Sequence, residues 1–327
     1  MFKKILITGS SGFIGYELCN LFLKKNYTVY GLDKITKKYS NKISFFKCDI
    51  MNKNNLLKVF KEINPQIIVH LAAKADLKSN EINYYRENFI GTRNVIDSAN
   101  LVPSIKRIIF TSTLLVNKIG TNIDKKFMFY NPNTKYGESK VLMEKIIRFS
   151  QCNFQWCIVR PTTIWGDNIE NHFNTLLSLI KKKLYFHIGY EKIYKSYGYV
   201  KNSVFQIYKL SISKNNQFNK RTYYIADYKS IELREWINKI SNLLVGKDVV
   251  IAIPVFLANF LSLIGDFLLI FGLNKFPLQS FRLNNILVNF KVDTADLEKV
   301  CGKLPFNPDE SILNFVNSYK LNQRKIT

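Results

Sequence analysis

A tyrosine and a lysine four residues apart, Tyr136 and Lys140, are residue types that can transfer protons. Residues at this spacing share one face of a helix, and the apolar pattern of residues 136–149 predicts such a helix. A free phenol titrates at about pH 10, and a nearby ammonium group favours the phenolate. Lys140 is therefore expected to lower the pKa of Tyr136 into the range where it can act as an acid or base.

The context of this pair distinguishes it from others with the same spacing. Two further Tyr-x3-Lys pairs begin at Tyr30, within a strand-like run, and at Tyr197, within a Gly/Tyr-rich loop. Only Tyr136 follows an apolar run, residues 108–110, that ends in hydroxyl side chains, Thr111-Ser112-Thr113. We therefore take Tyr136 and its lysine as the candidate acid–base pair.

A glycine-rich turn near the start of the chain has the residue types that bind a diphosphate. The stretch Thr8-Gly9-Ser10-Ser11-Gly12-Phe13-Ile14-Gly15 joins an apolar run, residues 5–7, to a segment with helical apolar spacing, residues 16–25. Glycines permit the sharp turn and the close approach of a pyrophosphate, and N–H groups at a helix start hold the anion. Asp33, which ends the next strand-like run, is placed to bind a ribose hydroxyl.

Short apolar runs alternate with helical segments through the first half of the chain. The expected strands are residues 5–7, 28–32, 43–46, 67–69 and 108–110, and the expected helices are 16–25, 54–63, 83–99 and 136–149. This alternation predicts an α/β protein with a doubly wound parallel sheet of the Rossmann type. Ligands bind such sheets beyond the carboxyl ends of the strands. The polar and small residues expected there are Gly9–Gly15, Asp33, Asp49, Ala72-Ala73 and Ser112-Thr113.

The remaining residues predict a smaller, C-terminal substrate-binding domain. Residues 167–195 and those after 227 fall outside the alternation. We expect residues 1–166 and about 198–227 to form the dinucleotide-binding domain. Residues of about 167–197 and 228–327 would then form the smaller domain, which would cover the strand ends.

The composition is that of a globular protein with an unusual charge. The formal net charge is +24, but the lysines are spread along all 327 residues, without a long basic tail. This distribution favours a biased background composition over a nucleic-acid-binding patch. The five cysteines show no metal-ligand spacing and suit reduced thiols in a cytoplasmic protein. Residues after Lys3-Lys4 are too briefly apolar to predict a signal peptide.

One long apolar segment, residues 249–273, raises the question of membrane contact. Pro254 and Gly272 mark its expected helical limits, and Asp266 is its only ionisable residue. A charge in the interior of a spanning helix costs roughly 2.5–3.5 kcal/mol. The favoured interpretation is a buried helix without a membrane-spanning role, and peripheral membrane contact is the alternative.

The order of these motifs resembles the extended short-chain dehydrogenases/reductases, and in particular their nucleotide-sugar epimerase/dehydratase group. The resemblance covers most of the chain. Its motifs are Thr8–Gly15, Asp33, Asp49-Ile50, His70-Leu71-Ala72-Ala73, Asn88 with Gly91-Thr92, Thr111-Ser112-Thr113, Tyr136-x3-Lys140, Arg160-Pro161, Trp165-Gly166 and Tyr199-Val200-Lys201-Asn202.

The resemblance implies a role for each matching residue. Tyr136 would be the acid/base, Lys140 would bind the nicotinamide ribose and tune Tyr136, and Thr113 would bind the reacting sugar oxygen. Asp33 suits NAD, whereas Lys34 beside it leaves NADP open. The expected cofactor-binding residues are Gly9, Ser11, Gly12, Phe13, Ile14, Gly15, Asp33, Asp49, Ile50, Leu71, Ala72, Ala73, Asn88, Thr111, Tyr136, Lys140, Arg160 and Pro161.

The expected substrate is a sugar linked to a nucleotide diphosphate. Arg282 is the first candidate for the diphosphate because a planar guanidinium matches phosphate oxygens. His70 is expected to pack at a strand end instead of taking part in chemistry. The candidate substrate-binding residues are Lys74, Thr163, His172, Tyr199, Asn202 and Arg282.

The reaction expected from the resemblance is epimerisation by transient hydride transfer, as in UDP-glucose 4-epimerase. Dehydratases of the family place an Asp-Glu pair after the active-site threonine, where this chain has Leu114-Leu115, so elimination is not expected. The alternatives are a nucleotide-sugar 4-keto reductase or dehydrogenase, a membrane-associated 3-beta-hydroxysteroid-dehydrogenase-like enzyme and a non-catalytic dinucleotide sensor. The expected enzyme is cytoplasmic and homodimeric, holds no metal and acts in polysaccharide biosynthesis.

Overall fold

The computed structural model describes residues 3–35, 42–121, 127–167, 172–214, 218–249, 251–272, 276 and 278–324. The chain divides into two compact units. Unit 1 comprises Met1–Ile164, Val200–Tyr228 and Val292–Pro305, and unit 2 comprises Trp165–Tyr199, Lys229–Lys291 and Phe306–Thr327.

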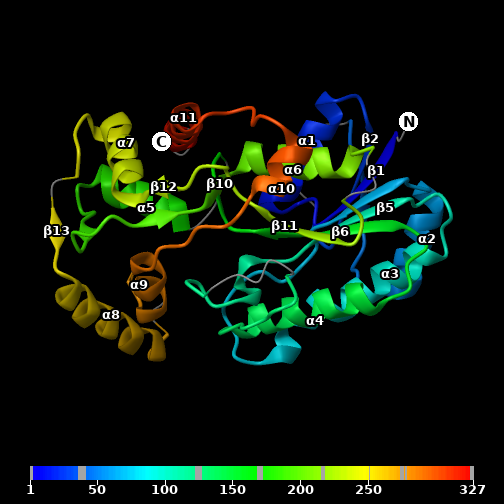
Figure 1. The fold of residues 1–327 in the computed structure, drawn as a ribbon, viewed down its shortest axis with the longest axis horizontal. Helices are drawn as coiled ribbons and strands as arrows, with labels where there is room; N and C mark the ends of the chain where they lie inside the picture. The colour runs from blue at the N-terminus through cyan, green and yellow to red at the C-terminus, as the bar shows by residue number, and fades with distance from the viewer. Residues whose placement is uncertain are drawn as a thin grey trace. The chain divides into compact units, whose positions relative to one another are not determined.

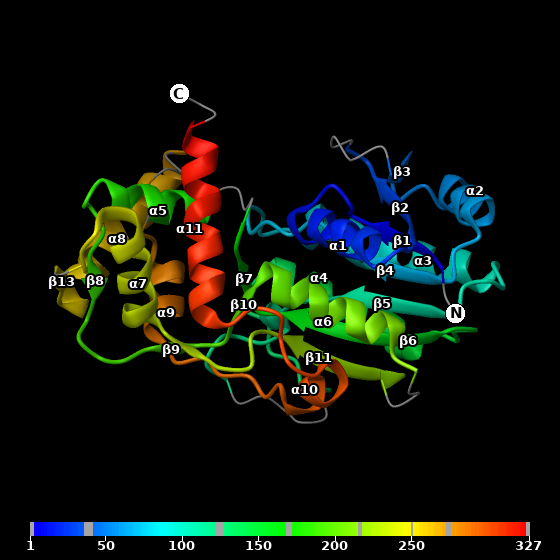
Figure 2. The same ribbon diagram turned by 90° about the horizontal axis from the view of Figure 1, so that it is seen from above.

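Unit 1 is built on a seven-stranded parallel sheet in the order β11-β6-β5-β4-β1-β2-β3 (Figure 2). Its central strands are continuous apolar runs because helices cover both faces of the sheet. The strands are β1 (Lys4–Thr8), β2 (Thr28–Asp33), β3 (Ser44–Lys47), β4 (Ile67–His70), β5 (Arg107–Thr111), β6 (Gln155–Pro161) and β11 (Arg221–Ile225). The expected doubly wound fold is confirmed.

The helices of unit 1 lie on the two faces of this sheet (Figures 1 and 2). On one face, α1 (Phe13–Lys24) packs against α6 (Val200–Ile212), which also contacts α10 (Ala295–Cys301). On the other face lie α2 (Lys53–Ile63), α3 (Thr92–Asn100) and α4 (Lys135–Phe149). Their apolar sides join Leu6, Ile68 and Ile108 of the sheet in one buried core. The core thus fixes the strand ends from which the loops of the site emerge.

The helix expected at 83–99 begins irregularly. A 3₁₀ turn, Ile82–Tyr85, and a π-helical turn, Glu87–Gly91, precede α3. A Cβ on Gly91 would lie 2.5 Å from the side chain of Ile50, so this turn packs closely against the loop after β3. π-Helical turns inside helices are frequent at functional sites.

Unit 2 combines helices with short two-stranded pairings. Trp165 lies at the centre of its aromatic core, 5.2 Å from the ring of Trp236 and 5.5 Å from that of Phe315. Its helices are α5 (His172–Lys181), α7 (Leu233–Val245), α8 (Val255–Ile270), α9 (Ser280–Leu287) and α11 (Pro308–Arg324). The strands β8 (His187–Ile188) and β13 (Ala252–Ile253) pair in parallel, and β9 (Tyr194–Lys195) pairs with β12 (Ile231–Glu232). The strand β10 (Tyr197–Tyr199) also belongs to unit 2, whereas β7 (Thr163–Trp165) begins in unit 1.

Residues 292–305 belong to unit 1, although the sequence analysis placed them in the smaller domain. The reason is tertiary: α10 packs against α6 and β11. Cys301 of α10 is buried there. All five cysteines are unpaired, and four of them are buried.

The expectation that residues 249–273 form a buried helix is wrong in one respect. The helix α8 starts directly after Pro254 and ends before Gly272, as expected. Its only buried residues, however, are Ala258, Ser262 and Gly265, whereas its large apolar side chains are mostly exposed. None of the helices in the described part of the chain combines the length and apolar character needed to cross a membrane.

Candidate functional site

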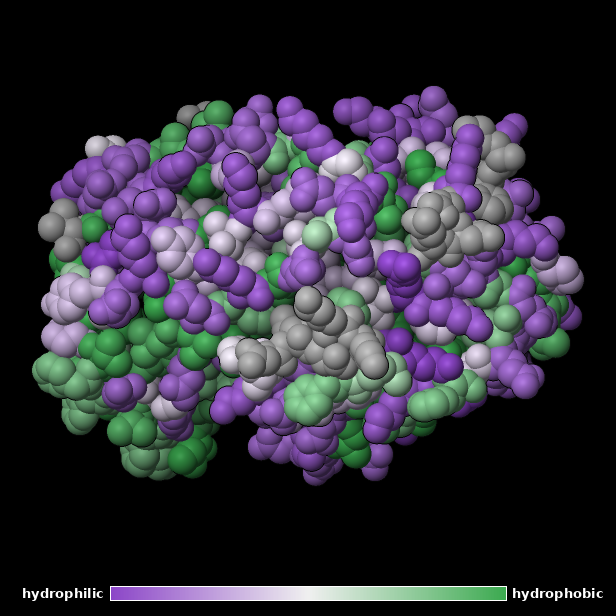
Figure 3. Space-filling view, viewed as in Figure 1, coloured by the Kyte–Doolittle hydropathy of each residue, from purple (hydrophilic) through white to green (hydrophobic). Residues whose placement is uncertain are grey.

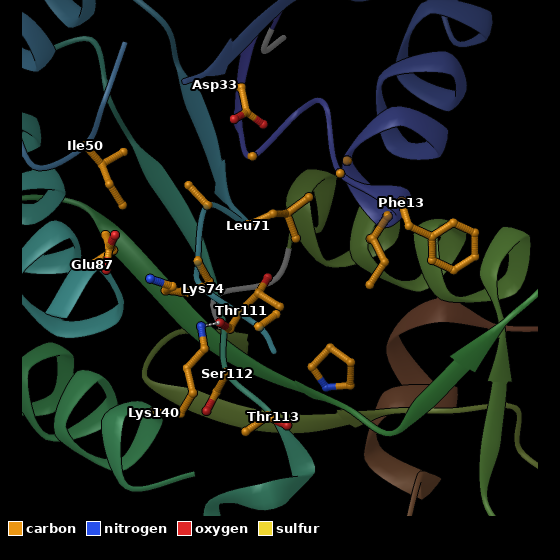
Figure 4. Close-up of a pocket in the computed structure, with 18 of the residues that line it drawn as sticks. Phe13, Asp33, Ile50, Leu71, Lys74, Glu87, Thr111, Ser112, Thr113 and Lys140 are labelled. Carbon is orange, nitrogen blue, oxygen red and sulfur yellow. Dashed lines mark hydrogen bonds between the residues drawn. The ribbon is translucent and has the colours of Figure 1, made fainter. Parts of the chain in front are cut away.

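A cavity of about 690 Å³ lies in unit 1, at the carboxyl ends of the sheet strands (Figure 4). Loops after β1 through β6 contribute to it, as expected for ligand sites of parallel sheets. The residues singled out from the sequence that line it are Gly9, Gly12, Phe13, Ile14, Gly15, Asp33, Lys34, Asp49, Ile50, Leu71, Ala72, Ala73, Lys74, Thr111, Ser112, Thr113, Tyr136, Lys140 and Pro161.

The turn between β1 and α1 can exist only with glycines at its key positions. Gly9 has φ +70°, and a Cβ there would lie 2.6 Å from the backbone nitrogen of Ala72. A Cβ on Gly15 would lie 2.2 Å from the carbonyl oxygen of Gly9. Gly12 is the N-cap of α1 and provides no capping side chain, so the first N–H groups of the helix can bind an anion.

Asp33 is held at the end of β2 by the glycine turn. Its Oδ2 accepts a hydrogen bond from the Ser11 N–H at 3.0 Å, and its Oδ1 accepts one from the Ile35 N–H at 3.3 Å. Lys34 lies 3.9 Å from Glu87 in a partly exposed ion pair. A fixed carboxylate at this point fits the hydroxyls of a ribose and repels a 2′-phosphate.

His70 joins the end of β4 to the helical turns that follow. Its Nδ1 lies 2.7 Å from Thr8 Oγ1, and its Nε2 lies 3.1 Å from Thr92 Oγ1. Burial, assisted by the charge of Lys140, lowers the pKa of His70 to about 3. A neutral, doubly hydrogen-bonded ring of this kind supports the loops of the cavity and does not line it.

Tyr136 opens helix α4 and points its hydroxyl at Thr113. The N-cap Thr134 accepts a hydrogen bond from the Gly137 N–H at 3.0 Å, which fixes the start of the helix. The Ser139 hydroxyl donates to the Tyr136 carbonyl oxygen at 2.7 Å. Burial raises the pKa of Tyr136 to about 12, against the lowering effect of its hydrogen bond to Thr113.

Lys140 lies on the same helix face, as the spacing predicts. Its Nζ donates a hydrogen bond to the Thr111 carbonyl oxygen at 2.8 Å (Figure 4). Burial lowers the pKa of Lys140 to about 7, although the nearby carboxylate of Glu144 raises it. The expected lowering of the Tyr136 pKa by Lys140 is therefore not found, because burial penalises both charged forms.

Glu144 is the anionic residue beneath this pair. Arg160 Nε and Nη2 each donate to its carboxylate at 2.8 Å, and both side chains are fully buried. The expectation that Arg160 binds the cofactor is therefore not supported, because its guanidinium is engaged by Glu144 and does not line the cavity. A second arginine, Arg148, lies 3.4 Å from the same carboxylate.

Two other expected cofactor residues lie outside the lining but support it. The Asn88 amide donates to Ser139 Oγ at 2.8 Å, and its carbonyl oxygen accepts from the Lys74 N–H at 2.7 Å. The Ser11 hydroxyl donates to the Ile35 carbonyl oxygen at 2.6 Å. Asn88 and Ser11 therefore position neighbouring residues and do not line the cavity themselves.

The expected substrate residues are divided between the units. In unit 1, Lys74 lines the cavity with its Nζ 3.3 Å above the ring centre of Tyr84. Thr163 lies between two lining residues without being one, and the Asn202 amide donates to Asp227 at 3.0 Å.

The remaining substrate candidates belong to unit 2. Tyr199 is buried, and its hydroxyl donates to Asp167 at 3.1 Å. Arg282 lies half-buried on α9. The side chain of His172 lies outside the described residues. No role of these residues in binding substrate follows from their contacts, and their roles stay predictions.

The sequence did not single out several further lining residues: Leu32, Cys48, Ala75, Asp76, Glu87, Thr162 and Ile164. Most of them directly adjoin a residue that was singled out, so their position at a strand end was a usable signal. Asp76 and Glu87 depend on the path of the loop after β4, which sequence pattern does not specify.

The lining fits an extended dinucleotide. One end offers the free helix start and the Asp33 carboxylate, and the other offers Lys140 and Tyr136. Thr111 Oγ1 is buried without a hydrogen-bond partner at the second end. Within the described residues, no group of three or more His, Cys, Asp or Glu side chains is arranged to hold a metal ion.

The fold and the site are those of a dinucleotide-dependent enzyme, and comparison with known proteins identifies its family. Residues 5–204 match the family model "NAD dependent epimerase/dehydratase family". The chain therefore belongs to this family of extended short-chain dehydrogenases/reductases.

Relatives with assigned activities fall into more than one substrate class. The chain is 31% identical to UDP-glucose 4-epimerase from Vibrio cholerae over 198 residues, which are 57% of this chain and 60% of that protein. It is 28% identical to the decarboxylating sterol-4-alpha-carboxylate 3-dehydrogenase of Mus musculus over 212 residues, 62% of this chain and 57% of that protein. The chain thus spans about three fifths of the length of these two relatives.

A third relative aligns over nearly the whole chain. The N-acetyl-alpha-D-glucosaminyl-diphospho-ditrans,octacis-undecaprenol 4-epimerase of Escherichia coli O157:H7 is 24% identical over 317 residues, 95% of this chain and 94% of that protein.

Two solved structures share the fold. UDP-glucose 4-epimerase from Thermotoga maritima with UDP-glucose has a TM-score of 0.74 at 15% identity, covering 98% of this chain and 99% of the other. The UDP-glucose 4-epimerase of Thermus thermophilus in complex with NAD has a TM-score of 0.70 at 17% identity, covering 97% of this chain and 98% of the other.

Proposed function

We propose that the protein is an NAD-dependent epimerase that inverts a hydroxyl-bearing carbon of a sugar carried on a diphosphate, with a nucleotide-linked sugar such as UDP-glucose as the first candidate. One observation carries the proposal: Thr113, Tyr136 and Lys140 meet in a cavity that starts at the glycine turn. The relatives that act on UDP-glucose support the substrate class.

The chain's own residues divide the work of the reaction. Bound NAD would supply the acceptor of a hydride and return it. Thr113 holds the reacting sugar hydroxyl, and Tyr136 Oη takes the proton of that hydroxyl during oxidation and returns it after reduction. When charged, Lys140 would offset part of the cost of burying the phenolate, although burial leaves the pKa of Tyr136 raised to about 12. Ser139 and Asn88 hold the helix start that presents Tyr136.

The position next to Thr113 limits the chemistry. Leu114 and Leu115 follow it in a short 3₁₀ turn, and Leu114 is buried. Neither side chain can move a proton at carbon or at a leaving hydroxyl. The chemistry of this position therefore argues against elimination. It leaves two reaction types: epimerisation, and a single oxidation or reduction by a 4-keto reductase or dehydrogenase.

Turnover without added cofactor separates these two reactions. Purified protein would be incubated with UDP-glucose or UDP-galactose, and the sugar products would be measured by NMR with and without added NAD or NADP. An epimerase is expected to form the C4 epimer without net change in the reduced-nicotinamide absorbance. Product formation that consumes one reduced cofactor per sugar would show a reductase instead. Cofactor released by denaturation would identify NAD or NADP, and we expect NAD because of Asp33.

A second candidate substrate is a sugar carried on a lipid diphosphate. The exposed apolar face of α8 favours it, and the relative from E. coli O157:H7 is named for such a substrate. The same NMR measurement with a short-chain polyprenyl-diphosphate-linked N-acetylglucosamine tests it. If the protein converts this compound and does not convert the UDP-sugars, the lipid-linked sugar would replace the nucleotide-linked sugar as the proposed substrate. We further propose that the enzyme acts in the cytoplasm and that it is a homodimer. Sedimentation of the purified protein would test the oligomeric state.

A further inference from the structure

We propose that α8 is a docking surface for an anionic membrane, on which the helix lies parallel to the bilayer plane. The proposal goes beyond the reaction of unit 1 and holds whether the sugar is carried on a nucleotide or on a lipid. Its basis is that α8 turns its large apolar side chains away from unit 2, the reverse of a helix that covers a core.

The inward face of α8 is made of small residues and packs very closely. Ala258, Ser262 and Gly265 are its buried positions. A Cβ on Gly265 would lie 1.9 Å from the carbonyl oxygen of Leu278, so the backbone of the helix touches the segment before α9. The Ser262 hydroxyl lies 3.2 Å from that of Ser280. This close contact fixes the rotation of α8 and keeps its other face outward.

The only ionisable residue of α8 is also turned toward its neighbour. Asp266 Oδ1 accepts a hydrogen bond from the Ser280 N–H at 3.1 Å and thereby caps the start of α9. A carboxylate on the outer face would oppose burial in lipid. With Asp266 engaged here, the outer face of α8 presents no ionisable side chain.

The outer face of α8 exposes several large apolar side chains to solvent. Phe256 is 74% exposed, Leu263 64% and Ile270 80%. The space-filling view shows apolar surface gathered over α8 and α9 (Figure 3). Contiguous patches of this kind mark interaction surfaces with proteins or membranes. Phenylalanine and leucine on one face are typical of helices that lie in the headgroup region.

Charge favours an anionic membrane as the partner of this face. The exposed lysines Lys181, Lys182 and Lys183 lie at and just after the end of α5, a few residues before β8. The strand β8 pairs with β13, which leads directly into α8. These lysines belong to the same unit as α8, and the whole chain carries a formal net charge of +24. Anionic lipid attracts this charge.

The dimensions of α8 indicate a parallel orientation. Its 16 residues span about 24 Å at 1.5 Å per residue, which is less than the bilayer core thickness of about 30 Å. Its polar inner contacts with α9 would also be lost if the helix crossed the membrane alone.

Vesicle co-sedimentation of the full chain tests the proposal. Vesicles of phosphatidylcholine alone would be compared with vesicles containing a quarter phosphatidylglycerol, at low and high salt. We expect the protein to sediment with the anionic vesicles, and salt to weaken the binding. The double variant Phe256→Ser with Phe260→Ser should bind at least tenfold more weakly, because both side chains lie on the outer face one turn apart.

A matched control replaces an equally exposed phenylalanine elsewhere. Phe149 ends α4 in unit 1 and is 79% exposed, so Phe149→Ser should bind vesicles like the unaltered protein. Circular dichroism would confirm that all variants fold. Absence of binding to anionic vesicles, or equal loss in Phe149→Ser and the double variant, would overturn the proposal. A concentration-dependent dimer that the double variant abolishes, without vesicle binding, would assign the face to a second copy instead.

Discussion

Replacing Lys140 by methionine should change how the stability of the cofactor-free protein depends on pH. Burial lowers the pKa of Lys140 to about 7 in the folded protein. An unfolded chain exposes this amine with an ordinary pKa of about 10.4. Between these values the unfolded state binds more protons than the folded state. The free energy of unfolding therefore contains a contribution that rises with pH from about 7 upward.

The size of this contribution follows from integrating the difference in bound protons. From about pH 7 to about pH 8.5, the folded amine goes from half protonated to almost neutral while the unfolded amine stays charged. The integral gives about 1.7 kcal/mol of added stability. Above this window, the buried thiols Cys19 and Cys157, whose pKa values burial raises, start to oppose it. Tyr136, with its raised pKa, titrates at still higher pH.

Urea unfolding at several pH values across this window measures the effect. The quantity of interest is the difference in free energy of unfolding between the unaltered protein and Lys140→Met, both stripped of cofactor. Loss of the hydrogen bond to the Thr111 carbonyl shifts the difference by a constant and leaves its slope unchanged. Other titrating groups, such as Lys195, contribute equally to both proteins. A difference that stays flat within about 0.5 kcal/mol would refute the lowered pKa of Lys140.

Three substitutions test the cavity itself. Tyr136→Phe should lower kcat by roughly 10²- to 10⁴-fold and leave the amount of bound cofactor unchanged. The control is Tyr85→Phe, which removes a buried hydroxyl outside the cavity lining. Comparable losses of kcat in both variants would contradict the acid–base role of Tyr136. Gly9→Ala should weaken NAD binding at least tenfold in calorimetry, because its Cβ meets backbone at 2.6 Å; unchanged affinity would show that the turn can shift at little cost. Asp33→Asn should weaken NAD more than NADP, and an equal effect on both would exclude Asp33 from the ribose site.

The fold of unit 1 could be predicted because its signals are local. The strands β1, β2 and β5 are short apolar runs that end at a glycine, an acid or a hydroxyl residue, and they are found within one or two residues of their expected limits. The parallel sheet then brings those ends together, since all strands point the same way. The glycine turn and the Tyr136–Lys140 pair follow from this arrangement.

What could not be predicted depends on which way a side chain points. Arg160 lies on β6 beside Pro161, yet its guanidinium turns to Glu144 and only Pro161 lines the cavity. In α8, nearly every residue is apolar, so the apolar pattern has no period that distinguishes an inner from an outer face. The small residues at 258, 262 and 265 are the signal that could have done so.

The pKa of Tyr136 shows a further limit of sequence reasoning. The spacing to Lys140 predicts proximity, and the two residues do share a helix face. Whether an ammonium lowers the pKa of a phenol depends, however, on how strongly burial opposes both charges, and that is a property of the assembled core.

The effect of burial on charged groups can also be tested at the buried ion pair of Glu144 and Arg160. Glu144→Gln leaves the guanidinium of Arg160 buried without its counter-charge, which should lower the free energy of unfolding by about 3–5 kcal/mol. Glu144→Leu combined with Arg160→Met removes both charges and should be more stable than Glu144→Gln. Urea unfolding of each protein measures this, and a double variant at least as unstable as Glu144→Gln would contradict it.

The same substitution also links the ion pair to the acid–base residues. Glu144 raises the pKa of Lys140 against the effect of burial. In Glu144→Gln the pKa of Lys140 should therefore fall below about 7, and the pH at which the Lys140 contribution to stability begins should move down with it. A pair that only stabilised the fold would leave that pH unchanged. A shift would show that Glu144, although it does not line the cavity, influences the charge state of Lys140.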